Sequence, residues 1–264
     1  MPKTRLDQLL VHRQLCESRE QARRLIMAGA VLVGGEPATK PGHKYADDVA
    51  IRLKEKLRFV SRGGYKLEAA LDHFAIDPTG WICADLGAST GGFTDVLLQR
   101  GAVKVYAVDV GYGQLHWKLR QDQRVVVMER TNARYLQQLP DPVHLVTIDA
   151  SFISLRLLLE PARRLLTPTG QIVALLKPQF EAGRSQVGKG GVIRDVRVHR
   201  QVLEDVLTWC EQHAMSPQGL IPSPILGPKG NREFLLWLWP GQPTGVPPDL
   251  IERALNLIAP APQS

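Results

Sequence analysis

Four polar residues each end a run of apolar residues in this chain: Asp85, Asp109, Asp149 and Lys177. In a sheet of parallel strands, the carboxyl ends of the strands share one edge, and ligands bind there. A carboxylate at that edge can accept hydrogen bonds from hydroxyl groups, and an amine can hold or accept a proton. The four residues therefore predict one site for a polar ligand.

A glycine-rich turn follows Asp85 directly. Its glycines have the spacing G-x-x-x-G-G, whereas a dinucleotide site has G-x-G-x-x-G and a P-loop ends on a lysine. Glycines let the backbone approach a ligand closely, and the helix that follows supplies free N–H groups. The turn therefore indicates a small, nucleoside-like ligand without a pyrophosphate. The candidate binding residues are Asp85, Gly87, Ala88, Ser89, Thr90, Gly91, Gly92 and Phe93.

Asp109 follows the next apolar run, twenty-four residues after Asp85. In nucleotide-binding α/β folds, an acidic residue at about this distance from the end of the first strand binds the ribose hydroxyls. A carboxylate suits this role because it can accept a hydrogen bond from each of two hydroxyls. An aspartate at a strand end can instead simply form a turn, and the glycine turn at the right distance favours the ribose interpretation. Asn132 follows the third run and would then lie near an adenine.

The elements that position these residues alternate along the chain from Gly64 onward. Strands are expected at 81–84, 103–108, 125–128, 145–148, 172–176 and 234–239, with helical stretches between most of them. This alternation predicts an α/β fold of the Rossmann-like kind, in which helices cover both faces of a mostly parallel sheet. The segment from Pro240 is rich in proline and predicts a turn and a short helix.

The first sixty residues have a different pattern. Leucines at 6, 9, 10 and 15 predict a short helix, and Ser18-x-x-Gln21 is a capping box that begins a second one, which Gly29 ends. Strands are expected at 31–33 and 49–53 with a glycine turn between them. Residues 54–63 are charged and have no clear period, so we interpret them as a linker.

The net charge of +7 is concentrated in this first segment. Residues 1–66 contain 14 Lys/Arg and 7 Asp/Glu, whereas residues 67–264 contain 19 of each. A basic module attached to a neutral domain is typical of nucleic-acid binding, although a basic surface that is merely solvated would look the same. The N-terminus shows no signal region, no apolar run is long enough for a membrane helix, and the three cysteines have no metal-site spacing. We therefore expect a cytoplasmic protein with no membrane and no metal partner.

Arg5-Leu6-Asp7, Ser18-Arg19-Glu20-Gln21-Ala22 and the apolar positions up to Val33 resemble the S4 RNA-binding domain. The resemblance implies that the second helix presents basic side chains to RNA. Arg19 and Arg23 are four residues apart, so they share one helix face suited to phosphate contacts. The candidate RNA-binding residues of this module are Arg5, Arg19, Arg23 and Arg24.

The later part resembles S-adenosylmethionine-dependent methyltransferases of class I, since it combines the alternating pattern with a nucleoside-binding turn. The order Lys66, Asp149, Lys177, Glu233 resembles the Lys-Asp-Lys-Glu tetrad of FtsJ-like RNA ribose 2′-O-methyltransferases. The surrounding residues match as well: Arg62-Gly63-Gly64-Tyr65-Lys66, Ile148-Asp149-Ala150-Ser151-Phe152, Lys177-Pro178-Gln179-Phe180-Glu181 and Gly230-Asn231-Arg232-Glu233. The resemblance implies S-adenosylmethionine as methyl donor, with Asp149 also near the donor.

The tetrad suits a ribose hydroxyl, which is a poor nucleophile. The hydroxyl must be held in line with the methyl group and must lose its proton as the new bond forms. Lys177 is the candidate base, and its amine must then be neutral, which burial and a second cation at Lys66 both favour. Asp149 and Glu233 oppose this and are expected to orient the lysines and the hydroxyl. Full proton transfer and mere positioning of the oxygen by Lys177 both stay open.

An S4 module followed by an FtsJ-like domain resembles the TlyA family, also called hemolysin A. The resemblance implies 2′-O-methylation of cytidine in 16S or 23S ribosomal RNA, with ribosomal RNA or ribosomal subunits as partner. It divides the chain into an S4-like domain with linker at 1–60, a methyltransferase domain at 61–243 and a tail with a short helix at 244–264. The glycine-rich loop after Lys177 could close over the target nucleotide and contact phosphate through Arg184 and Lys189, although a merely flexible surface loop would have the same composition.

Other functions fit individual features less well. A base-N methyltransferase usually carries Asn-Pro-Pro-Tyr or Asp-Pro-Pro-Tyr where this chain has Asp149-Ala150-Ser151-Phe152, and no cysteine suits a cytosine-C5 enzyme. An S4-bearing pseudouridine synthase would need Arg-Leu-Asp in its catalytic domain, whereas here it lies at residues 5–7. The remaining alternative is an RNA-binding or hemolysin-type protein without methyltransferase activity, against which the intact tetrad argues.

Overall fold

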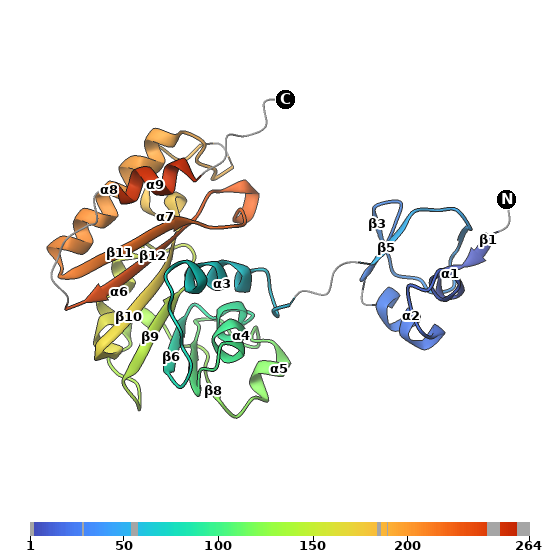
Figure 1. Cartoon of the computed structure of the whole chain (residues 1–264), viewed down its shortest axis with the longest axis horizontal. Coiled ribbons are helices and arrows are strands. Elements are labelled where there is room, and N and C mark those ends of the chain that lie inside the picture. Colours follow the sequence, from blue (N-terminus) through green and yellow to red (C-terminus); the bar gives the residue numbers. More distant parts are fainter. Residues whose placement is uncertain are drawn as a thin grey trace. The chain divides into compact units, whose positions relative to one another are not determined.

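The computed structural model describes residues 3–27, 29–53, 58–183, 186–188, 190–241 and 249–257 (Figure 1). The chain forms two compact units, Met1–Arg58 and Phe59–Ser264. The first is small and has its own apolar core, and the second contains the larger sheet.

The first unit packs two helices against short strands. Helix α1 spans Leu6–His12 and helix α2 spans Arg19–Met27. Ser18 Oγ accepts a hydrogen bond from Gln21 N at 3.2 Å, and Gly29 follows α2 with a positive φ of 65°, as the capping pattern predicts. The strands are β1 (Lys3–Arg5), β2 (Val31–Val33), β3 (Glu36–Ala38), β4 (Lys44–Ala46) and β5 (Ile51–Leu53).

The core of this unit forms where the helices meet the strands. Leu6, Leu10, Ala22 and Ile26 on the two helices pack with Val31 on β2, and all five are fully buried. Strand β2 pairs antiparallel with both β3 and β5, and β1 pairs antiparallel with β4. The predicted pair of helices on a small sheet is therefore confirmed, with three strands that the sequence pattern did not indicate.

The second unit is built on a seven-stranded sheet in the order β11-β12-β10-β9-β6-β7-β8. Strands β10, β9, β6, β7 and β8 run parallel, and β12 pairs antiparallel with β10 and β11. The strand bounds are β6 (Ile82–Leu86), β7 (Lys104–Val108), β8 (Val125–Met128), β9 (Val143–Ile148), β10 (Leu166–Leu176), β11 (Met215–Pro222) and β12 (Phe234–Pro240). The predicted α/β fold with a mostly parallel sheet is confirmed.

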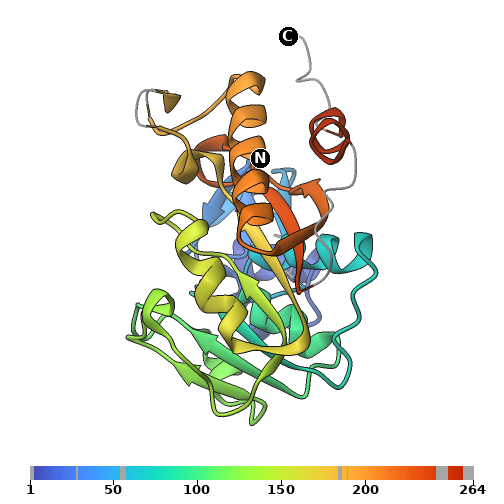
Figure 2. The ribbon, with the colours of Figure 1, turned by 90° about the vertical axis from the view of Figure 1, so that its left-hand side faces the viewer.

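Helices cover both faces of this sheet. Helices α3 and α4 share one apolar cluster with the sheet, and α6, α8 and α9 share the cluster on the opposite face. The longest of them, α8, is the orange helix in Figure 2. The helical bounds are α3 (Gly63–His73), α4 (Gly92–Gln99), α5 (Trp117–Arg120), η1 (Ala133–Tyr135), α6 (Arg156–Leu165), α7 (Pro178–Glu181), α8 (Val196–Gln212), η3 (Pro228–Gly230) and α9 (Leu250–Asn256).

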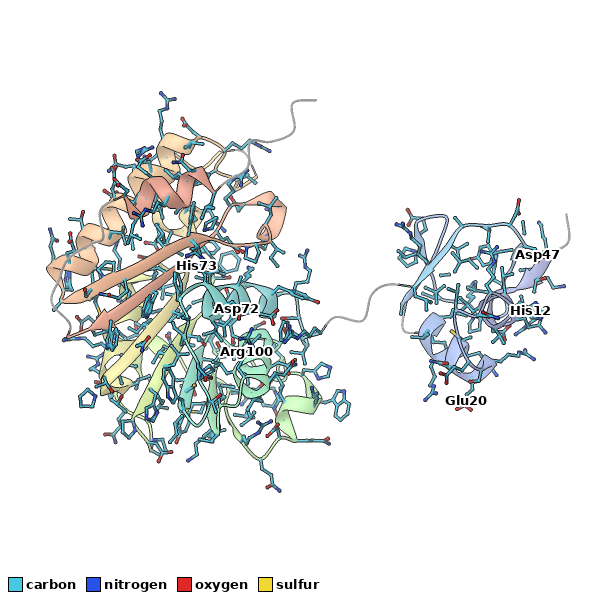
Figure 3. The ribbon with its side chains drawn as sticks, in the orientation of Figure 1. His12, Glu20, Asp47, Asp72, His73 and Arg100 are labelled. Carbon is cyan, nitrogen blue, oxygen red and sulfur yellow. The ribbon has the colours of Figure 1, made fainter. Side chains whose placement is uncertain are left out.

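Gly92 lets α3 and α4 start close together. A Cβ at Gly92 would lie only 3.0 Å from the backbone nitrogen of Gly64, so a larger residue would push the helices apart. At the other end, Arg100 after α4 forms an ion pair of 2.6 Å with Asp72 on α3 (Figure 3). The close start of the helices places Lys66, on the first turn of α3, beside the glycine turn.

Two sequence interpretations need correction. Residues 59–63 are not part of a linker, because Phe59 is 3% exposed in the core of the second unit and α3 begins at Gly63. Strand β11 was missed because Pro217, Gly219 and Pro222 interrupt it. It lies at the edge of the sheet and is bulged between Pro217 and Gly219, positions where proline and glycine are tolerated in strands. Helix α9 packs against α8 and β11, as part of the second unit.

Candidate active site

Two adjoining cavities open at the carboxyl ends of the parallel strands of the second unit. The larger has a volume of about 500 Å³ and the smaller one about 460 Å³. They lie where β6 has β7 on one side and β9 on the other, which is the point at which ligands bind in such sheets. Both cavities are lined by Gly87, Ser89, Asp149, Ser151 and Phe152.

Gly87 allows the ends of β6 and β9 to lie close together. It has φ of 85°, and a Cβ there would lie 2.8 Å from the backbone oxygen of Asp149 and 3.1 Å from Cα of Ala150. No other residue type combines that backbone conformation with so close an approach. Gly87 therefore shapes the wall that the two cavities share.

Asp109 organises the smaller cavity. Its two carboxylate oxygens accept hydrogen bonds from Ser89 N at 2.8 Å and from Gly111 N at 2.7 Å. An ionised carboxylate has about four acceptor positions, so lone pairs remain for ligand hydroxyls. Asn132 also lines this cavity, and its side-chain oxygen accepts from Arg134 N at the start of η1.

Asp85 is fully buried beneath the glycine turn. Its Oδ2 accepts from Thr94 N at 3.0 Å and from Thr94 Oγ1 at 2.7 Å, and Oδ1 accepts from Thr147 Oγ1 at 3.1 Å. Burial, which disfavours the charged form, raises the pKa of Asp85 to about 7 against the opposing effect of these hydrogen bonds. Asp85 lines the larger cavity, but its carboxylate mainly holds the start of α4 against the sheet.

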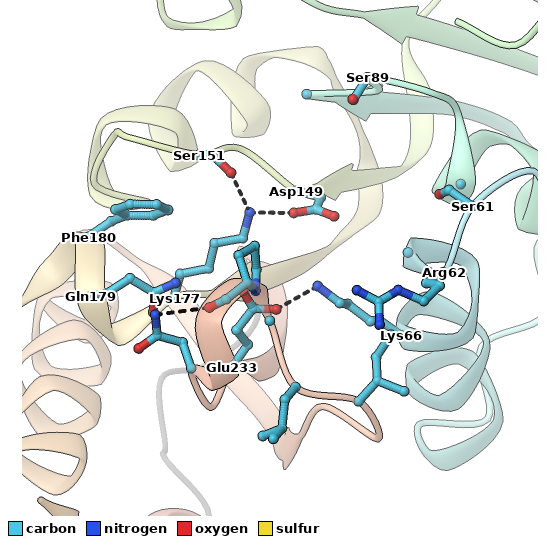
Figure 4. Close-up of a pocket in the computed structure, with 18 of the residues that line it drawn as sticks. Ser61, Arg62, Lys66, Ser89, Asp149, Ser151, Lys177, Gln179, Phe180 and Glu233 are labelled. Carbon is cyan, nitrogen blue, oxygen red and sulfur yellow. Dashed lines mark hydrogen bonds and ion pairs between the residues drawn. The ribbon is translucent and has the colours of Figure 1, made fainter. Parts of the chain in front are cut away.

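The four residues of the predicted tetrad line the larger cavity and form two ion pairs (Figure 4). Lys177 Nζ lies 2.6 Å from Asp149 Oδ1, and Lys66 Nζ lies 2.5 Å from Glu233 Oε2. Lys66, Lys177 and Glu233 are buried, with exposed fractions of 8%, 7% and 1%.

Each pair retains capacity for a ligand. Lys177 Nζ also donates to Ser151 Oγ at 2.9 Å, which uses two of its three N–H donors and leaves one. Glu233 Oε1 is buried and accepts no hydrogen bond from the described residues. Gly227 is required beside it, because a Cβ there would overlap the Glu233 carboxylate.

Most of the predicted ligand-binding residues lie together. Gly87, Ala88, Ser89, Thr90, Gly92 and Phe93 all line the larger cavity, and Asp149 lines both. Gly91 is the exception, because the side chains of Leu115 and Leu119 pack where its Cβ would be, and its φ is 94°. Arg184 and Lys189 lie outside the described residues.

Several residues of the cavity walls were not predicted from the sequence. Ser151, Phe152 and Phe180 lie within the same motifs as Asp149 and Lys177, so those motifs could have indicated them. Arg62, directly before α3, also lines the larger cavity. Gln114 lines the smaller cavity, and no sequence pattern indicated it.

In the first unit, the predicted RNA-binding arginines divide into two kinds. Arg5 and Arg19 both bond to the buried carboxylate of Asp7, with N–O distances of 3.0 and 3.2 Å. The hydrogen bonds from Arg5, above all, hold the pKa of Asp7 below its usual value. Arg23 and Arg24 are exposed on α2 and form no ion pair with a described residue.

The described residues lack two other kinds of feature, a metal-binding cluster and a membrane-spanning helix. They contain no cluster of three or more His, Cys, Asp or Glu side chains that could hold a metal ion. Among them there is also no helix with the length and apolar character needed to cross a membrane.

Comparisons with known proteins agree with this architecture. Residues 59–239 match the model of the FtsJ-like methyltransferases, and residues 4–48 match the S4 domain. A Bacillus subtilis protein assigned as the rRNA methyltransferase YqxC is 52% identical, with 91% of this chain and 87% of that protein covered. The 16S/23S rRNA (cytidine-2′-O)-methyltransferase TlyA of Mycobacterium tuberculosis is 47% identical, with 89% of this chain and 90% of that protein covered.

A solved structure agrees as well. A Streptococcus thermophilus protein assigned as a hemolysin superposes with a TM-score of 0.74 at 48% identity, covering 97% of this chain and 96% of that one. Both relatives and the solved structure span both units. The chain belongs to the TlyA family of FtsJ-like methyltransferases, which carry an S4 domain before the methyltransferase domain.

Proposed function

We propose that this methyltransferase transfers the methyl group of S-adenosylmethionine to the ribose 2′-hydroxyl of a cytidine in ribosomal RNA. One observation carries the proposal. Two lysine–carboxylate pairs face a cavity that adjoins a second, nucleoside-sized cavity, with Asp149 in the wall of both. A methyl donor and a nucleotide can therefore meet at that carboxylate.

The smaller cavity fits the donor. Asp109 keeps free lone pairs for the two ribose hydroxyls, and Asn132 lies in the same wall, where the adenine would be. Ser89, Thr90 and Gly92 line the larger cavity, toward which the methionine part would extend. S-adenosylmethionine, when bound, supplies a sulfonium methyl group as the electrophile and leaves as a thioether.

The tetrad handles the hydroxyl and its proton. The remaining N–H of Lys177 donates to the 2′-oxygen and holds it in line with the methyl group. Lys177 can then pass one proton to Asp149, 2.6 Å away, and rotate about its Cε–Nζ bond, so that the lone pair left on the amine takes the hydroxyl proton as the oxygen–carbon bond forms. Asp149 is half-buried, so the proton can reach solvent from there. Lys66 and Glu233 position the ribose, with Glu233 Oε1 as the acceptor for a second hydroxyl.

Phe152 supports a nucleotide as the substrate. Its side chain is 91% exposed, it lines both cavities, and its ring lies 5.2 Å from that of Phe180 between centroids. Phe152 also has φ of 64°, an unfavourable conformation for a bulky residue that suggests a functional constraint. Unpaired RNA bases commonly stack on exposed aromatic side chains.

The two units, Met1–Arg58 and Phe59–Ser264, would divide the work. The S4 unit would bind ribosomal RNA or a ribosomal subunit, and the second unit would carry out the transfer. The choice of cytidine rests on the name of the M. tuberculosis relative, which acts on 16S and 23S rRNA. A ribosomal RNA substrate also implies a cytoplasmic location.

Methyl transfer to purified ribosomal subunits tests this function. Labelled S-adenosylmethionine is incubated with the protein and small or large subunits, or with the RNA extracted from them, and 2′-O-methyl positions are mapped. We expect label on the ribose of a cytidine in at least one subunit. Label on a base, or no label with any substrate, would contradict the proposal.

For the S4 unit, we expect Arg23→Ala to weaken RNA binding and to lower the slope of log K against log salt by about one, because one phosphate contact is lost. Arg19→Ala should have a similar effect and should also lower the melting temperature, because Asp7 loses one of its partners. RNA affinity measured over a range of salt concentrations checks both. Arg164→Ala, at an exposed arginine on α6, is the matched control. An unchanged slope for Arg23→Ala would mean that this arginine is merely solvated.

A further inference from the structure

The larger cavity contains more positive charge than its tetrad uses. Its wall carries four cations and three carboxylates, and two of the cations are paired within the tetrad. The third carboxylate, Asp85, directs its oxygens to Thr94 and Thr147 instead. Arg62 and Lys229 are therefore the wall cations that no described carboxylate neutralises.

Arg62 comes from the α3 side of the cavity. It directly precedes the helix and is exposed, and its guanidinium forms no hydrogen bond or ion pair within the described ranges. Figure 4 shows its side chain beside Lys66, directed into the pocket. Arginine presents five N–H donors in a planar fork that matches phosphate oxygens, so this side chain could bind an anion with two parallel hydrogen bonds.

Lys229 comes from a different segment of the wall, the turn that leads to Glu233. Its Nζ donates to Gly190 O at 3.1 Å, which leaves two N–H donors free. The turn is held firmly by Asn231, which is 4% exposed. The side-chain oxygen of Asn231 accepts from Ile193 N at 3.1 Å, and its nitrogen donates to Gly191 O at 2.9 Å. Hydrogen bonds of Lys229 and Asn231 therefore connect the turn that carries the lysine to the segment from Gly190 to Ile193.

We propose that Arg62 and Lys229 form a seat for the RNA phosphodiester that adjoins the methylated ribose. The proposal rests on the function proposed above, because a ribose held at Lys177 brings a neighbouring phosphate into the same cavity. Taking that negative charge out of water without a partner would be unfavourable, and the tetrad charges are already paired with each other. The two cations outside the tetrad supply the missing charge. Holding the phosphate would also fix the 2′-oxygen in line with the methyl group.

Arg62→Ala should lower kcat/KM for RNA by about 10- to 100-fold, and Lys229→Ala should lower it by about tenfold, because a charge-assisted contact is lost. Arg62→Lys should fall in between, since it keeps the charge and loses the fork. The affinity for S-adenosylmethionine should stay unchanged in all three variants. Arg164→Ala should match the unmodified protein, because this exposed arginine lies on α6 and outside both cavity walls.

A chemical change in the RNA makes the test specific. RNA ligated from a synthetic fragment carries one uncharged methylphosphonate, either 5′ or 3′ of the methylated ribose. At one of these positions, the methylphosphonate should lower kcat/KM of the unmodified protein about as much as Arg62→Ala lowers it on ordinary RNA. For Arg62→Ala itself, the methylphosphonate at that position should cause little further loss. If the effects of Arg62→Ala and of the methylphosphonate on kcat/KM multiplied at both positions, the two would be independent, and the proposed phosphate site would be wrong. Absence of methyl transfer by the unmodified protein to ordinary RNA would instead overturn the proposed function.

Discussion

Replacing Lys177 by alanine is expected to lower kcat for methyl transfer by about a thousandfold or more, since both the positioning of the hydroxyl and its proton transfer depend on this amine. The affinity for S-adenosylmethionine should change little, because the proposed donor site is the wall around Asp109. The fold should persist, because the partner left behind, Asp149, is partly exposed to solvent. Single-turnover rates and calorimetric titration with S-adenosylmethionine measure the two effects.

Two further lysine variants separate a charge effect from proton transfer. Lys177→Arg keeps a cation next to Asp149, but a guanidinium does not give up its proton. It should therefore be nearly as inactive as Lys177→Ala. Lys118→Ala removes a lysine that is 60% exposed and should leave the rate unchanged. Near-normal turnover of Lys177→Arg would show that Lys177 only positions the oxygen.

Gly87→Ala is expected to abolish measurable binding of S-adenosylmethionine and to destabilise the protein by about 2 kcal/mol. The added Cβ would lie 2.8 Å from the carbonyl oxygen of Asp149, at a φ of 85° that alanine rarely adopts. To relieve the contact, the turn must move away from Asp149, which changes the wall that both cavities share. In a unit of this size, about 2 kcal/mol corresponds to a fall in melting temperature of about 4–8 °C.

Gly80→Ala is the control that separates the effect of the close contact at Gly87 from the effect of placing alanine at a positive φ. Gly80 also has a positive φ, 77°, but nothing lies within 4 Å of a Cβ there. This variant should show only the conformational effect, as a small drop in melting temperature with normal binding of S-adenosylmethionine. If Gly87→Ala bound the donor as well as Gly80→Ala does, the close approach at Gly87 would not shape the donor site.

The sequence predicted the parts of the fold that have a regular apolar pattern. Most of the parallel strands are buried on both faces, so they appear as apolar runs such as 105–108 and 145–148. Four of them were found within two residues of their observed start, whereas β10 begins at Leu166, six residues before the predicted 172. Strand β11 was not found, because an edge strand accepts the prolines and the bulge that break such a pattern. Residues 59–63 were assigned to the linker because the burial of Phe59 depends on contacts with α3, which no local pattern reveals.

The candidate site was also only partly predictable from the sequence. Its charged residues could be named from their order and motifs, but the ion pairs that they form could not. Only the structure pairs Lys177 with Asp149 and Lys66 with Glu233, and only the structure attaches Arg5 and Arg19 to the buried Asp7. The cavity's uncompensated cations, Arg62 and Lys229, become visible only after these pairs are known.

The sequence by itself predicted most of the sheet and the glycine turn, because both depend on residue types at short and regular spacing, and it named the tetrad residues by the resemblance of their motifs to FtsJ-like methyltransferases. The tertiary structure decided how the charges are paired, which glycines of the turn line the cavities and that Phe152 is exposed in the cavity walls. Lys66 and Glu233 are 167 residues apart in the chain, yet their charged atoms lie 2.5 Å apart. Such contacts are set by the packing of helices and strands distant in the sequence, and the strength of a charge interaction depends on that distance and on burial.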